Sequence, residues 1–233
     1  MDQKTTSIIP SVIFEYHGIE ITSTIIYTWI VMALLIGVSF AITREVTIRG
    51  RVGQTVLEMI VEWVLDTIQD ITKTDPFPML PLVGTLALFL LVANTISTIP
   101  GMSAPTKDIS TTSALAVIVF FSVPFYGIRK KGAKAYFTSY IQPTIIMLPF
   151  NIIGEFSRTL ALAVRLFGNV MSGELIVGIL FLLAGLFVPI PMLLLSILTG
   201  VIQAYIFSIL TIVYIGSGLQ THEKKEETKD IEL

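Results

Sequence analysis

The sequence predicts an all-α membrane protein with five transmembrane helices and one interfacial amphipathic helix, the last two spans forming a long tilted hairpin. Hydrophobic residues make up 53% of the 233 residues, and charged residues only 14%. The mean hydropathy of +0.82 is far above what the surface of a water-soluble domain tolerates. Long uncharged runs alternate with short charged clusters, as in chains that cross a bilayer repeatedly. Residues 1–233 are therefore expected to form a single membrane domain.

Charge and cysteine content exclude several function classes. The net charge is −2 and the basic residues fall in short clusters, so no nucleic-acid partner is expected. The chain has no cysteine, which excludes disulfides and thiolate chemistry. No phosphate-binding glycine loop and no His-Glu-x-x-His sequence occurs. We therefore expect no catalytic residue, no cofactor and no metal.

The first span is predicted at residues 21–43. This run is uncharged between Glu20 and Arg44 and exceeds the roughly 20 residues that cross a hydrocarbon core as a helix. Residues 1–20 contain Asp2 and Glu15, which a cleavable signal peptide would not carry. They are expected to remain as an external amino-terminal segment.

Residues 54–72 predict an amphipathic helix that lies on the membrane. A carboxylate recurs at every fourth residue, at Glu58, Glu62, Asp66 and Asp70, which places an acidic face on an otherwise apolar helix. A solvated face is the preferred interpretation, because interfacial helices need no further function for it. An ion-collecting surface is the alternative.

Two more spans are predicted at residues 79–100 and 110–128. Pro100-Gly101 ends the first of them, and a cationic cluster within residues 129–134 follows the second. Because cytoplasmic loops are rich in Lys and Arg, the second of these spans ends in the cytoplasm. The loop with Lys107 and the amino terminus then lie outside a cell inner (plasma) membrane.

The last two spans are predicted at residues 143–187 and 191–216, with a turn around Pro189 and Pro191. The stretch from 152 to 187 would be about 54 Å long as a helix, against a hydrocarbon core of about 30 Å. This arm must therefore tilt steeply or break. The second arm returns the chain to the cytoplasm, where residues 217–233 form an acidic tail.

Among the charged residues of the predicted spans, Arg165 is the strongest indication of a function. An arginine at bilayer depth costs at least about 2.5 kcal/mol, so it requires a partner or a cavity. Arg158, Asn169 and Ser172 fall near its face of a helix, whereas Glu174 is turned about 180° away and lies about 13 Å along the axis. The other spans contain no Asp or Glu, so a second protein is expected to supply the counter-charge. A snorkelling arginine is the alternative.

Other polar residues leave their roles open. Glu174 is either a protonated carboxyl group bonded within the bundle or a relay group in a hydrated cavity. Asn94 and Gln203 are neutral and of the kind that hydrogen-bond neighbouring helices. Gly168 and Ser172 have small-xxx-small spacing, which favours close helix packing.

The segment Glu155–Leu175, above all Leu162–Leu175, closely resembles subunit a of F-type ATP synthases. The resemblance implies a stationary subunit in which Arg165 faces a rotating c-ring and two half-channels carry protons or sodium ions. Asn169 and Gln203 are then polar companions of Arg165, and Glu174 belongs to the external half-channel. Further matching residues occur in the same order: Gln54, Glu58, Asn94, Ile99-Pro100-Gly101, Pro105-Thr106, Asp108, Gln203 to Phe207 and Leu210 to Tyr214.

The resemblance also implies partners and a mechanism. The partners are the c-ring, a b-type peripheral stalk and the lipid bilayer, with ATP chemistry on other subunits. A fixed arginine favours the ionised rotor carboxylate and blocks a leak between the half-channels. The supporting polar residues are Arg158, Ser172, Asn94, Asp108 and Ser196.

Three residues depart from the family pattern. Thr159 stands where many relatives have Pro, and Ala161 where many have Ser. Ser196 occupies a position that in some relatives carries His or Glu paired with the Glu174 position. The external access path is therefore expected to be built differently.

Two other function classes fit the sequence poorly. An intramembrane protease would need paired aspartates within its spans, and the spans have none. A self-contained channel or transporter predicts internal repeats and a counter-ion for Arg165 within the chain, and we find neither in the sequence.

Overall fold

The computed structural model describes residues 12–16, 19–44, 52–97, 102–141, 146–185 and 188–220. Helices dominate it, as predicted. The elements are β1 (Val12–Tyr16), β2 (Ile19–Thr22), α1 (Ser23–Thr43), α2 (Val52–Thr72), α3 (Leu80–Ile96), η2 (Pro105–Lys107), α4 (Ile109–Lys131), α5 (Ala133–Ile141), α6 (Met147–Ala184) and α7 (Pro189–Gln220).

Four of the described helices are long and apolar enough to cross a membrane: α1, α4, α6 and α7. Helix α3 is apolar but has only 17 residues. Helix α6 runs unbroken for 38 residues, so the long arm predicted to tilt or break does not break. Pro100-Gly101 and the tail beyond residue 220 lie outside the described residues.

Two elements were not predicted from the sequence. Within residues 12–16 and 19–22, β1 and β2 pair antiparallel with Glu15 opposite Glu20. Both strands are rich in β-branched and aromatic residues, which favour extended structure. The prediction from charges and apolar spans did not include strands. Helix α5 was also missed, because the cationic cluster after α4 was interpreted as loop. Gly132 at φ 84° ends α4 and a new helix begins directly after it.

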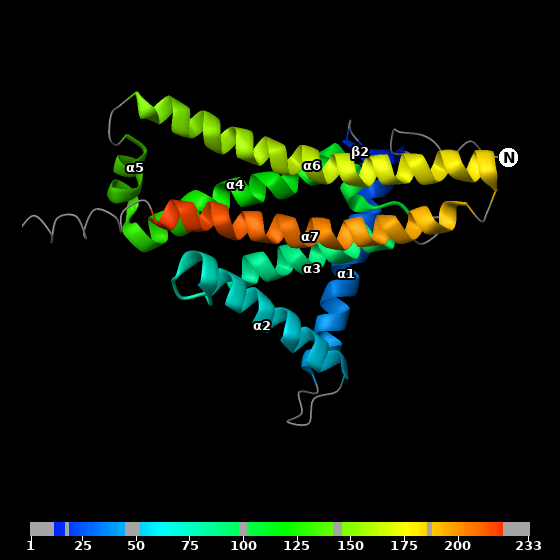
Figure 1. Cartoon of the computed structure of the whole chain (residues 1–233), viewed down its shortest axis with the longest axis horizontal. Helices are drawn as coiled ribbons and strands as arrows, with labels where there is room; N and C mark the ends of the chain where they lie inside the picture. The colour runs from blue at the N-terminus through cyan, green and yellow to red at the C-terminus, as the bar shows by residue number, and fades with distance from the viewer. Residues whose placement is uncertain are drawn as a thin grey trace, which may run out of the picture.

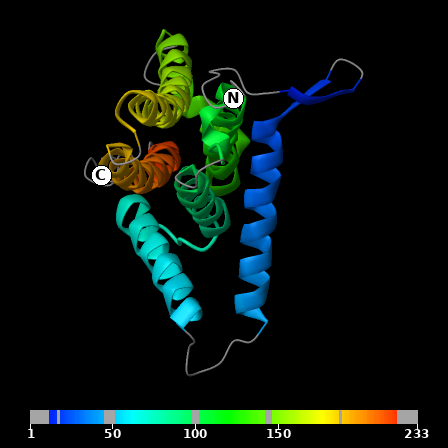
Figure 2. The ribbon, with the colours of Figure 1, turned by 90° about the vertical axis from the view of Figure 1, so that its right-hand side faces the viewer.

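The long helices α6 and α7 lie side by side as an antiparallel hairpin, with α3 and α4 packed along it (Figure 1). Gly185, at φ 70°, ends α6 before the hairpin turn, a conformation that glycine adopts without cost. Helix α1 stands across the direction of this hairpin in both views (Figures 1 and 2). If α1 follows the membrane normal, α6 and α7 are strongly tilted.

Two clusters of buried apolar side chains hold the helices together. The first joins α3, α4, α6 and α7 around Leu90, Leu166 and Phe207. The second joins α2 to α3, α4 and α7 through Val64 and Ile68. The carboxylate face of α2 stays exposed, as the amphipathic prediction required.

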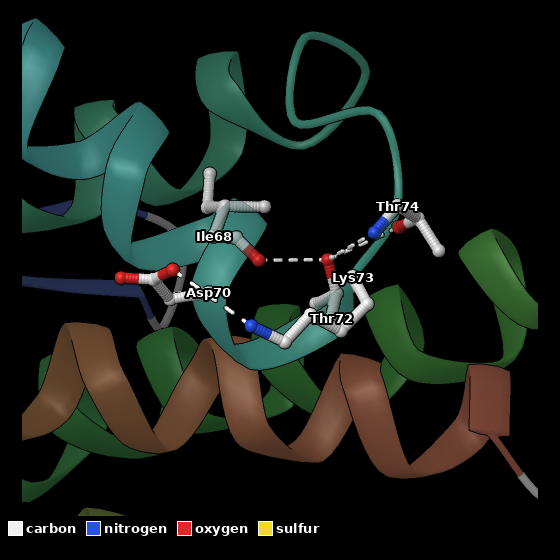
Figure 3. A network of polar contacts seen from close by, with 5 residues as sticks. All are labelled: Ile68, Asp70, Thr72, Lys73 and Thr74. Atoms are coloured by element: carbon white, nitrogen blue, oxygen red, sulfur yellow. Dashed lines mark hydrogen bonds and ion pairs between the residues drawn. The ribbon is translucent and has the colours of Figure 1, made fainter.

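The carboxyl end of α2 is closed by a small polar network (Figure 3). The Thr72 hydroxyl donates to the Ile68 carbonyl at 2.7 Å and accepts from the Thr74 hydroxyl at 3.0 Å and the Thr74 amide at 3.4 Å. Lys73 ends the helix at φ 52°, and its amide donates to the Gln69 carbonyl at 2.9 Å. The ion pair between Lys73 and Asp70, at 3.8 Å, is well exposed and contributes little.

Lys73 offers a stability test. Because a side chain in the left-handed region costs about 1 kcal/mol that glycine avoids, Lys73→Gly should stabilise the end of α2 by up to about 1 kcal/mol. The matched control is Lys73→Ala, which removes the same ion pair without relieving the backbone. Thermal unfolding of the purified assembled complex should give a higher midpoint for Lys73→Gly than for Lys73→Ala. Equal midpoints would contradict a strained backbone at this residue.

Candidate functional site

A cavity of about 170 Å³, here called the polar cavity, lies between α3, α6 and α7. Among the described residues that line it, none carries a charge. It brings together five residues singled out from the sequence and two more, Ser97 and Thr199. Its polar lining is Asn94, Ser97, Asn169, Ser172, Ser196, Thr199 and Gln203.

One hydrogen bond ties α6 to α7 at this cavity. The Asn169 Nδ2 group donates to Gln203 Oε1 at 2.7 Å. Gln203 is only 2% exposed, and its Nε2 atom is buried without a hydrogen-bond partner among the described residues. Buried polar groups are nearly always satisfied, so this amide has a donor left for a water, an ion's hydration shell or a partner's carboxylate.

Asn94 on α3 connects three segments. Its Nδ2 group donates to the Gly200 carbonyl of α7 at 3.1 Å, and its Oδ1 atom accepts from the Thr106 hydroxyl at 2.8 Å. Asn94 and Thr106 are both buried. Space is tight here, because a Cβ at Gly200 would lie 3.0 Å from Cβ of Asn94. Asn94 therefore fixes α7 and the α3–α4 loop relative to each other.

Glu174 on α6 is paired with the α3–α4 loop. Its Oε2 atom lies 2.7 Å from Nζ of Lys107, with the two side chains 20% and 22% exposed. Its Oε1 atom accepts from the Ala104 amide at 3.2 Å. The sequence analysis missed this partner, although Lys107 is the only cation between residues 74 and 128. Its neighbour Asp108 caps α4 by accepting from the Ser110 amide at 2.9 Å.

Arg165 is exposed on α6 and makes no hydrogen bond or ion pair with any residue in the described ranges. Leu160 and Val164 of the same helix are also exposed, at 54% and 53%. No charged group of the described chain therefore offsets its charge. The supply of a counter-charge by another protein stays a prediction.

A second cavity of about 320 Å³, here called the amino-end cavity, lies between the first part of α6, α4 and α7. Arg158 lines it together with Asn151, Thr159 and Tyr214. The Arg158 guanidinium lies 5.7 Å from the centre of the Tyr214 ring, within cation–π range. Along α6 the order is thus the amino-end cavity, Arg165 and then the polar cavity.

The family is decided by sequence comparison. A family model described as the ATP synthase A chain matches residues 25–216. The chain belongs to this family. It is 50% identical to ATP synthase subunit a 2 of a Picosynechococcus species over 92% of this chain and 93% of the relative. It is also 48% identical to ATP synthase subunit a 2 of Acaryochloris marina, over 94% of each chain.

A further relative, ATP synthase subunit a of Albidiferax ferrireducens, is 46% identical over 93% of this chain and 95% of its own. The resemblance drawn from residues 155–175 is thereby confirmed. The chain is a non-catalytic membrane subunit of an ATP synthase.

The site residues predicted from the sequence do not all meet at one place in the structure. Asn94, Asn169, Ser172, Ser196 and Gln203 meet at the polar cavity. Arg165, Arg158, Glu174 and Asp108 lie outside its lining. Within the described ranges no group of three or more His, Cys, Asp or Glu side chains could hold a metal ion.

Proposed function

We propose that this chain is the stationary ion-conducting subunit of a rotary ATP synthase, in which Arg165 couples the passage of protons or sodium ions to the rotation of a c-ring. The observation that carries the proposal is Arg165, which is exposed, has no partner among the described residues and lies between two cavities on one helix. A cation within a membrane is unfavourable unless a counter-charge reaches it. A carboxylate on a passing rotor subunit supplies that charge.

The two cavities supply the access paths. The polar cavity and the amino-end cavity form parts of two half-channels, each reaching the rotor from a different side of the membrane. An ion enters through one, binds the rotor carboxylate, and leaves through the other after nearly a full turn. Arg165 lies between them on α6, so its fixed charge repels a cation that would pass directly.

Individual residues take distinct roles in this scheme. Arg165 stabilises the ionised rotor carboxylate and thereby promotes ion release. Asn169 and Gln203 present amide groups beside it, and Glu174 belongs to the external path. Each elementary charge crossing 100 mV carries about 2.3 kcal/mol, so several ions are needed per ATP. The supporting polar residues are Arg158, Ser172, Asn94, Asp108 and Ser196.

The topology we propose has five crossings, by α1, α3, α4, α6 and α7, with α2 at the interface of the cell membrane. Helix α3 would reach about 26 Å at about 1.5 Å per residue, near the lower limit for a span. The Lys107–Glu174 pair supports the order, because it needs the α3–α4 loop and the later part of α6 at the same side. The amino terminus is then outside and the carboxyl terminus cytoplasmic.

The partners in this proposal are the c-ring, a b-type peripheral stalk and lipid. The exposed face of α6 that carries Arg165 is the surface for the c-ring. The decisive experiment replaces Arg165 in the assembled complex, and its outcomes are set out in the Discussion. Repeating the wild-type assay with and without sodium names the coupling ion, because only a sodium-coupled enzyme requires sodium for synthesis.

Gln203 provides a second test of the polar cavity. Gln203→Leu removes the acceptor for Asn169 and the buried donor, each worth about 0.7 kcal/mol, so ion-driven ATP synthesis should fall about tenfold. The matched control is Ser208→Ala, a buried position of α7 whose hydroxyl bonds only its own helix, to the Ala204 carbonyl. Synthesis would be measured in reconstituted vesicles with equal amounts of complex. Equal rates for both variants would contradict a role of Gln203 in ion passage.

A further inference from the structure

The α3–α4 loop is fastened to three helices by polar side chains. Lys107 and the Ala104 amide hold Glu174 of α6, and Thr106 holds Asn94 of α3, which in turn binds the Gly200 carbonyl of α7. The short helix η2 also contacts α1 and α4. This loop therefore packs against the half of the α6–α7 hairpin that is nearer to its turn (Figure 1).

The chain of contacts reaches the polar cavity itself. Asn94 and Gly200 both line the polar cavity, and so do Ser172 and Gly173, the two residues that precede Glu174. The carboxylate does not line it, because both of its oxygens bond the loop. Glu174 therefore lies beside the polar cavity, and its carboxylate is bonded to Lys107 and to the Ala104 amide.

We propose that Lys107 is a positioning residue for ion entry: it holds Glu174 against the α3–α4 loop and offsets its charge, so that the polar cavity keeps a neutral wall. The inference rests on the proposed function and adds a residue to it. Two opposite charges this close and only about one-fifth exposed interact more strongly than a surface pair.

Removing either partner leaves the other charge uncompensated beside the cavity, with opposite effects on a cation. An unpaired Glu174 attracts the coupling ion and retains it, whereas an unpaired Lys107 repels it. Removing both restores a neutral wall. The effect of the pair is therefore expected in the ion concentration that gives half the maximal rate of ATP synthesis. Loss of folded protein lowers the maximal rate but does not change this concentration.

The experiment measures ATP synthesis by the whole complex in reconstituted vesicles while the coupling ion is varied on the side of the α3–α4 loop. The variants are Lys107→Gln, Glu174→Gln, the double variant and Lys107→Arg. Lys130→Gln is the matched control, an exposed cation at the end of α4 that loses the same charge. Rates are normalised to the amount of assembled complex.

We expect Lys107→Gln to lower the half-saturating ion concentration about tenfold and Glu174→Gln to raise it about tenfold, because each variant leaves one charge uncompensated beside the cavity. The double variant should lie between the two single variants, and Lys107→Arg should lie within about threefold of wild type. An unchanged value in Lys107→Gln would overturn the proposal. So would a double variant as defective as Glu174→Gln, because Glu174 would then act on the ion by itself.

Two further arms keep the result decisive. If Lys107→Gln does not assemble, Lys107→Arg decides: a value near that of wild type supports the pair, and a tenfold shift overturns it. Arg165→Ala is assayed in the same vesicles. Retained synthesis there refutes the proposed function, whereas lost synthesis there with an unchanged Lys107→Gln refutes only the role of Lys107.

Discussion

Arg165→Ala should abolish ion-driven ATP synthesis while leaving the subunit in the complex. The side chain is exposed and has no partner in the described chain, so its removal breaks no hydrogen bond or ion pair among the described residues. A charge pair at 4 Å is worth about 4 kcal/mol at an effective dielectric constant of 20. Losing it should slow ion release from the rotor about a thousandfold. The measurement is ATP synthesis in vesicles under an imposed ion gradient.

The same vesicles report a second consequence. Without the fixed cation nothing repels an ion between the two cavities, so passive ion leak through Arg165→Ala should rise above that of wild type. Lys130→Ala is the matched control, because it removes an exposed cation at the end of α4 that lines neither cavity. Synthesis at the control's rate in Arg165→Ala would mean that Arg165 only packs or snorkels.

The sequence was most informative about residues whose charge is costly to place in a membrane. Arg165 stands out because an uncharged run of this length is expected to lie in lipid, and the structure leaves it unpaired among the described residues. The helical bearing of Asn169 and Ser172 likewise follows from 3.6 residues per turn. Both side chains line the polar cavity. Local periodicity and burial cost are thus enough to select the helix on which the proposed function rests.

Contacts between distant segments were beyond the reach of the sequence. Lys107 and Glu174 are 67 positions apart, and nothing in their spacing shows that a loop folds back onto α6. The β1–β2 pairing was missed for a different reason, since short strands carry a weak pattern beside long apolar helices. The amino-end cavity depends on how α4, α6 and α7 cross, which composition does not encode.

The second large effect of a substitution is expected at Gly200, where α7 packs closely against α3. This glycine is buried, its carbonyl accepts the Asn94 amide at 3.1 Å, and a Cβ added to it would lie 3.0 Å from Cβ of Asn94. Gly200→Leu must therefore push α3 and α7 apart. Overpacking costs about 1–3 kcal/mol, and the broken Asn94 bond adds about 1 kcal/mol.

The loss should reach the function through the same contact. Asn94 also holds Thr106 of the loop that carries Lys107, so Gly200→Leu should lower both the thermal midpoint of the complex and its ion-driven synthesis. Gly37→Leu is the matched control, because a Cβ at Gly37 meets nothing within 4 Å and both glycines lie inside helices. If the two variants lose stability equally, helix–helix distance is not what Gly200 sets. If Gly200→Leu alone fails and Gly200→Ala recovers part of the midpoint, the closeness of α3 and α7 is what holds the polar cavity in shape.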